Sequence, residues 1–183
     1  YTRIWVVPVA TVVMLLVALA SGLLLGRTRA GHAMYAVGGG ENSDIATHPT
    51  DPDIFFSSLQ YVVTKFDRRT GQTVNLGPYP RMEMGSPARE HRERWNWLAP
   101  LTFSPVFPHA LYVGSQHLWR SKDFGESWEK ISPDLTYADP ETLQETGGPI
   151  RTDQDGPEVY GTVFSIAPSR FDADTIWVGS DDG

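Results

Sequence analysis

Leu118-Trp119-Arg120-Ser121-Lys122-Asp123-Phe124-Gly125-Glu126-Ser127-Trp128 is the stretch that decides the fold, because its residue pattern predicts a hairpin turn between two strands. The Asp123 carboxylate can accept hydrogen bonds from backbone N–H groups of its own turn. Gly125 can adopt a positive φ without a Cβ penalty. Trp128 is expected to begin the next strand and to bury about 150–250 Å² in the core. In this role Asp123 holds the turn and is not a catalytic group.

The same arrangement of turn and strand occurs three times along the chain. Residues 48–58, 104–115 and 167–180 each contain a proline, then a polar turn, then a strand centred on an aromatic residue and closed by small residues. The central aromatics are Phe56, Tyr112 and Trp177. The strands expected before the three turns are 45–47, 101–103 and 163–166. A β-sandwich also has short strands, but it gives no reason for a sequence to repeat, so the repeat favours the four-stranded blades of a propeller.

Two further segments look like relatives of the turn at 121–128. Residues 66–72 occupy the corresponding place in the first repeat, with the aspartate and the glycine at altered spacing. Residues 179–183 look like the entry to a third unit. We therefore expect the propeller to continue beyond Gly183, with this chain truncated at its C-terminus.

Ser121, Asp123, Gly125 and Trp128 match S-x-D-x-G-x-x-W, and the chain thereby resembles the Asp-box (BNR) repeat β-propellers of the sialidase and sortilin types. The wider sequence is similar to large bacterial sortilin-like proteins that are often labelled glycosyl hydrolase. The similar stretches are 38–41, 66–72, 94–97 with Pro100, 131–136, and 147–150 through 160–162. This resemblance implies a structural Asp-box and peptide or protein ligands.

The N-terminal segment Ile4 to Gly26 has 23 residues without a charge. As a helix it would span about 34 Å, enough for a bilayer core of about 30 Å. We therefore predict that residues 1–30 form a transmembrane helix or signal anchor, and that the chain is a single-pass membrane protein with an extracytoplasmic propeller. The alternative is a cleaved signal peptide, because Ala18-Leu19-Ala20 matches an A-x-A cleavage site.

Charge and composition exclude several classes of function. The formal net charge is −7, and residues 1–30 contain three arginines and no acid, so the remainder is more acidic still. Such a body repels nucleic acid, which we exclude as a partner. The chain has no cysteine, and its five histidines show no metal-ligand spacing. We therefore expect neither a metal nor a cofactor.

The candidates for chemistry lie in two segments of the chain. Asp155 and Glu158 are the weak candidates for a glycosidase carboxylate pair, although acids in turns are ordinary. Trp95 and Trp97 would share one face of a strand and could stack on a sugar, although core packing is the commoner role of such a pair. The alternating charges of residues 89–94 predict a solvated, self-neutralising loop.

These patterns together predict an all-β fold in which residues 36–183 form a partial propeller of two to three four-stranded blades, with one transmembrane helix before it. The predicted function is a membrane-anchored, non-enzymatic module that binds a protein or peptide or serves as a scaffold, with a glycan as a further ligand class. The alternative is a glycoside hydrolase of the Asp-box type whose active-site carboxylates lie partly outside this chain. The remaining blades would come from the full-length protein.

Overall fold

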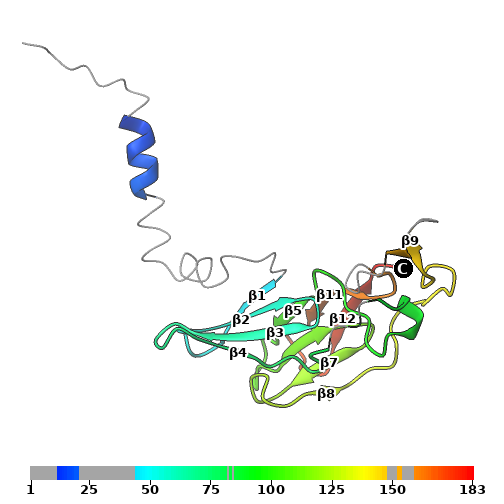
Figure 1. Cartoon of the computed structure of the whole chain (residues 1–183). Helices are drawn as coiled ribbons and strands as arrows, with labels where there is room; N and C mark the ends of the chain where they lie inside the picture. Colours follow the sequence, from blue (N-terminus) through cyan, green and yellow to red (C-terminus); the bar gives the residue numbers. More distant parts are fainter. Residues whose placement is uncertain (1–11, 21–43, 82, 84, 148–151, 154–158) are drawn as a thin grey trace, which may run out of the picture. The chain divides into compact units, whose positions relative to one another are not determined.

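The structure is a computed structural model of the chain, and it describes residues 12–20, 44–81, 83, 85–147, 152–153 and 159–183 (Figure 1). Contacts divide the chain into two compact units, Tyr1–Gly40 and Glu41–Gly183.

In the N-terminal unit the described residues form one helix, which covers residues 12–20. A helix of this length is about 14 Å long, whereas a bilayer requires about 20 apolar residues. No described helix has both the length and the apolar character that a membrane span needs, so the prediction of a single-pass membrane protein is wrong. The rest of the predicted span, residues 4–11 and 21–26, lies outside the described residues.

The second unit is mostly β, as predicted. Two four-stranded antiparallel sheets each have their strands in chain order (Figure 1). The first sheet contains β1 (Asp44–Thr47), β2 (Ile54–Leu59), β3 (Val62–Asp67) and β4 (Gln72–Asn75). The second sheet contains β5 (Leu101–Phe103), β6 (Leu111–Gly114), β7 (Leu118–Ser121) and β8 (Glu129–Lys130). The predicted strands at 45–47 and 101–103 and the two aromatic strands that follow them are confirmed.

Two shorter antiparallel pairs complete the described strands. β9 (Thr146–Gly147) pairs with β10 (Thr152–Asp153), and β11 (Val163–Pro168) pairs with β12 (Ile176–Ser180). β11 and β12 contain the third predicted repeat. One short 3-10 helix, η1 (Ala88–Glu90), lies between the two large sheets in the chain. No closed ring of sheets is formed by the residues that the structure describes.

The first strands of the sheets lie close to one another. β1 packs beside β5, and β11 packs beside β5 and β6. The Val163 backbone N–H donates to the Ser115 carbonyl at 2.7 Å, which joins β11 to the end of β6. Gly114 permits this approach, because a Cβ at this position would lie 2.6 Å from Val163 Cγ1.

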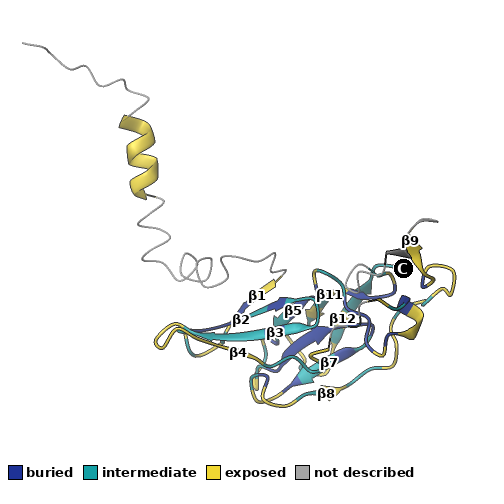
Figure 2. Cartoon of the chain, in the orientation of Figure 1, coloured by how far each residue is buried: buried dark blue, intermediate teal, exposed yellow. Residues whose placement is uncertain are grey.

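Strand β6 is buried along its whole length, because it has a core on each face (Figure 2). Leu111 and Val113 belong to the core shared with the first sheet, which also contains Phe56 and Val63. Tyr112 points to the other face and joins a smaller cluster against β11 and β12. The second sheet is therefore a layer packed between the first sheet and the β11–β12 pair.

Candidate functional site

The turn between β7 and β8 is held by side-chain hydrogen bonds to its own backbone. Asp123 Oδ1 accepts from the Ser127 backbone N–H and from the Ser121 hydroxyl, both at 2.8 Å. The Ser121 hydroxyl also accepts from the Gly125 N–H at 2.7 Å. Gly125 has a φ of +92°, which glycine adopts without strain. The hydrogen bonds from Ser127 lower the pKa of Asp123, so this carboxylate is an ionised acceptor inside the turn.

The same turn also fastens the second sheet to the first. The Trp128 indole N–H donates to the Leu76 carbonyl at 2.6 Å. A Cβ on Gly125 would lie 3.2 Å from Leu76 Cδ1, so the glycine also permits a close approach between the sheets. The residues of the motif thus join the two sheets.

The corresponding turn of the first sheet, between β3 and β4, has a looser form of this geometry. Asp67 Oδ1 accepts from the Arg69 backbone N–H at 2.8 Å, and the Gly71 N–H donates to the Asp67 carbonyl. Gly71 has a φ of +70°. The altered spacing of Asp67 and Gly71 therefore still gives an aspartate-held turn with a left-handed glycine.

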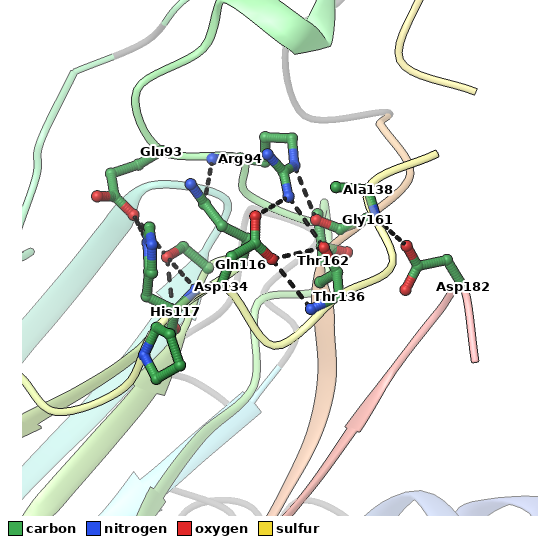
Figure 3. Close-up of polar contacts among 12 residues, drawn as sticks. Glu93, Arg94, Gln116, His117, Asp134, Thr136, Ala138, Gly161, Thr162 and Asp182 are labelled. Carbon is green, nitrogen blue, oxygen red and sulfur yellow. Dashed lines mark hydrogen bonds and ion pairs between the residues drawn. The ribbon is translucent and has the colours of Figure 1, made fainter. Parts of the chain in front are cut away.

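The segment before β5 contains an acidic side chain, Glu93, that is buried among hydrogen-bond donors. Glu93 has a side chain only 1% exposed, and its carboxylate accepts three hydrogen bonds. Figure 3 shows Glu93 beside His117. The donors are Lys130 Nζ at 2.6 Å, the Ser115 hydroxyl at 2.8 Å and His117 Nδ1 at 2.9 Å. All three donors come from the second sheet or its β6–β7 turn, so Glu93 anchors the preceding loop to that sheet.

The surroundings of Glu93 favour its ionised form. Burial raises its pKa, but the hydrogen bonds from Lys130, His117 and Ser115 outweigh burial and leave the pKa below its usual value. A glycosidase proton donor needs the opposite shift. Ser115 also lacks the geometry of an activated nucleophile, since its hydroxyl donates to the carboxylate and not to the imidazole of His117.

Arg94, the next residue, makes a second buried polar cluster. Its guanidinium donates to the Gly161 carbonyl at 2.9 Å, to Asp134 Oδ2 at 2.7 Å and to the Thr136 hydroxyl at 3.0 Å (Figure 3). Its backbone N–H donates to Gln116 at 2.7 Å. Burial raises the pKa of Asp134, but hydrogen bonds from Thr136 and Arg94 lower it further than burial raises it. The pair is therefore an ionised bridge between three segments.

The carboxylates that follow β12 complete the network. Asp181 accepts from the backbone N–H groups of Gly161 and Thr162 and from the Thr162 hydroxyl. Asp182 accepts from the Ala138 N–H at 3.0 Å (Figure 3). The Asn96 side-chain amide donates to the Thr162 hydroxyl at 3.1 Å. We call the side chains that join these segments the inter-sheet polar network; its members are Glu93, Arg94, Asn96, Ser115, Gln116, His117, Lys130, Asp134, Thr136, Thr162, Asp181 and Asp182.

The structure describes the two tryptophans predicted to face a ligand but not the two predicted catalytic candidates. Asp155 and Glu158 lie outside the described residues. Trp95 is 3% exposed and belongs to the core between the first two sheets, so it cannot stack on a ligand. Trp97 is half-buried, and the segment that contains both tryptophans forms no strand, so the expected common strand face is absent.

The prediction of a solvated loop at 89–94 is wrong for half of its charged or titratable residues. His91, Glu93 and Arg94 are buried. The alternating charges suggested mutual neutralisation, whereas the partners of Glu93 and Arg94 lie in segments far along the chain. Nothing local in the sequence marks those partners.

Within the part of the chain that the structure describes, no three histidine or acidic side chains gather into a metal-binding group. Comparison of the chain with protein-family models, curated proteins and solved structures gives no match.

Proposed function

We propose that residues 36–183 are part of an Asp-box β-propeller that acts as a non-enzymatic protein- or peptide-binding or scaffold module. The observation that carries this proposal is the placement of the first strands. β1 lies beside β5, and β11 lies beside β5 and β6, while the strands of each complete sheet follow one another in chain order up to the fourth. A propeller is built in this way, with the first strand of each blade nearest the central channel.

Two further features support the propeller. The Asp-box turn joins the third and fourth strands of the second sheet, and the aspartate-held turn at Asp67 has the same place in the first sheet. Strand β6 is buried on both faces, as expected for a strand in a blade that has a neighbouring blade on each side. The β11–β12 pair then supplies the first two strands of a third blade.

The direction of the pKa shifts of the described carboxyl groups supports a binding module over a glycosidase. Every described carboxyl group with a resolved pKa shift is shifted downward. A retaining or inverting glycosidase requires one carboxyl group with a raised pKa beside one that stays charged. The six carboxyl groups with a resolved pKa shift instead accept hydrogen bonds within turns, between neighbouring strands or between segments.

The test uses the full-length protein that contains this chain. It is presented to a phage-displayed library of random peptides and is separately incubated with a panel of fluorogenic glycosides. Saturable binding of selected peptides without glycoside hydrolysis is the expected result. Hydrolysis that disappears in the double variant Asp155→Asn, Glu158→Gln, at unchanged melting temperature, would replace the proposal with the glycosidase.

A further inference from the structure

The turns that follow β1, β5 and β11 are closed by the same backbone hydrogen bond. In each turn the first residue donates its backbone N–H to a carbonyl at the end of the turn. The donor and acceptor residues are His48 and Ile54 at 3.1 Å, Ser104 and Ala110 at 2.8 Å, and Ser169 and Thr175 at 2.9 Å. His48, Ser104 and Ser169 therefore occupy equivalent positions in three equivalent turns.

In the second and third turns the side chain at this position is a hydroxyl group that accepts from the turn. Ser104 Oγ accepts from the Val106 backbone N–H at 3.2 Å. Ser169 Oγ accepts from the backbone N–H groups of Phe171 and Asp172 at 3.1 and 3.3 Å. A serine hydroxyl does not titrate in the physiological range, so these two turns are held in the same way at every such pH.

In the first turn a histidine ring takes the place of the hydroxyl group. His48 Nδ1 accepts from the backbone N–H groups of Thr50 and Asp51 at 3.3 and 3.0 Å. A backbone N–H can only donate, so Nδ1 must present a lone pair, and the proton of the neutral ring is on Nε2. Of the three turns, the first alone is held by an acceptor that acid can remove.

The same ring packs between the first two sheets. Its centroid lies 4.1 Å from that of Phe124, in the turn between β7 and β8. It also lies 6.4 Å from Phe56 on β2 and 6.2 Å from Phe103 on β5. His48 therefore connects the β1–β2 turn to the second sheet as well as holding the turn itself.

The surroundings of the ring favour its neutral form. Burial lowers the pKa of His48, Asp51 raises it, and Lys65 and His109 lower it again, with a net decrease. The unfolded chain therefore binds a proton at a pKa near 6.5, and the folded chain binds it only at a lower pH. The contribution of the neutral ring to stability is complete above about pH 6.5 and is lost as the pH falls through the folded value.

The acids near the ring have other partners. Asp51 pairs with Arg69 at 3.1 Å. In the turn between β7 and β8, Asp123 accepts from its own turn, and Glu126 pairs with Lys65 at 3.5 Å. The other charged side chains of the β1–β2, β3–β4 and β7–β8 turns are Asp53, Arg68 and Lys122. A protonated ring would have to compete with Arg69 for Asp51.

We propose that His48 is an acid-sensitive switch that opens the β1–β2 turn. Protonation of Nδ1 removes the acceptor of the Thr50 and Asp51 N–H groups and places a third hydrogen among these donors. The turn then opens, and its contact with Phe124 loosens. This inference goes beyond the proposed binding function and does not depend on it, because it requires only the local geometry of the turn.

The experiment is nuclear magnetic resonance of the full chain between about pH 7.5 and about pH 5, a range that brackets the ordinary histidine pKa. At the upper pH the ring nitrogens of His48 should show the proton on Nε2, and the ring should titrate below about pH 6.5. The amide protons of Thr50 and Asp51 should move upfield with the same midpoint. Those of Phe171 and Asp172, in the equivalent serine-held turn, are the internal reference and should not follow this titration.

His48→Ser installs the acceptor of the other two turns and removes the titration. In this variant the amide protons of Thr50 and Asp51 should lose their pH dependence, and the urea midpoint should fall less between the two pH values than in the wild type. His109→Asn is the matched control, because it removes a neighbouring histidine that does not hold the first turn. Its Thr50 and Asp51 amide protons should titrate as in the wild type.

Three results would each overturn the proposal. The first is titration of the His48 ring without movement of the Thr50 and Asp51 amide protons. The second is a proton on Nδ1 at neutral pH. The third is equal pH dependence in His48→Ser and in the wild type. The first two are measured on the wild-type chain, so they decide the question even where a variant fails to fold.

Discussion

Replacement of Glu93 by alanine tests the inter-sheet polar network most directly. The change removes a carboxylate that is 1% exposed and accepts hydrogen bonds from Lys130, Ser115 and His117. Loss of one partner from a buried ion pair costs about 3–5 kcal/mol of unfolding free energy. Lys130 is 36% exposed and can regain water, so we expect a loss near 3 kcal/mol.

The measurement is urea-induced unfolding of the full chain at pH 7, followed by tryptophan fluorescence. Glu129→Ala is the matched control, since Glu129 also accepts a short hydrogen bond from a cation, Arg120 at 2.8 Å, but its side chain is 62% exposed. An exposed pair contributes about 0.2–1 kcal/mol. A loss for Glu93→Ala no larger than that for Glu129→Ala would refute the inference that burial makes this carboxylate important.

Three further predictions concern the turn, the packing and the response to acid. Asp123→Ala should lower the unfolding free energy by about 1–3 kcal/mol without loss of any measured activity; an unchanged melting curve combined with lost activity would mean that Asp123 is catalytic. Gly114→Ala should cost about 1–3 kcal/mol in the same urea assay, because its methyl group would overlap Val163; a neutral result would show that β6 and β11 do not pack as described. The pKa values of Glu93 and Asp134 are lowered on folding, so their contribution is complete above the unfolded pKa values near 4 and is lost as the pH falls through the folded values. Stability should therefore fall below about pH 4.5, and Glu93→Gln should flatten this dependence; an equally steep curve for the variant would contradict it.

The strands were predictable because their signals are local. Alternation and turn residues around Phe56, Tyr112 and Trp177 identify the second strand of each group without reference to any other part of the chain. The turn at Asp123 was predictable for the same reason, since its hydrogen bonds reach no further than Ser127.

The inter-sheet polar network was not predictable, because its contacts join residues that no local pattern relates. In the sequence, the charges around Glu93 and Arg94 look like those of a solvated loop. Only the folded sheets place Lys130 beside Glu93 and Asp134 beside Arg94.

The contacts of Arg94 constrain the order in which this chain can fold. Its guanidinium bonds with Asp134, 40 residues later, and with the Gly161 carbonyl, 67 residues later. During synthesis, Arg94 therefore emerges well before its partners, and the segment around it cannot be buried at low cost until β11 arrives. Closing such long loops is slow compared with forming the β6–β7 hairpin. The second sheet and the β11–β12 pair are thus expected to acquire their final packing in one cooperative step, not as independent units.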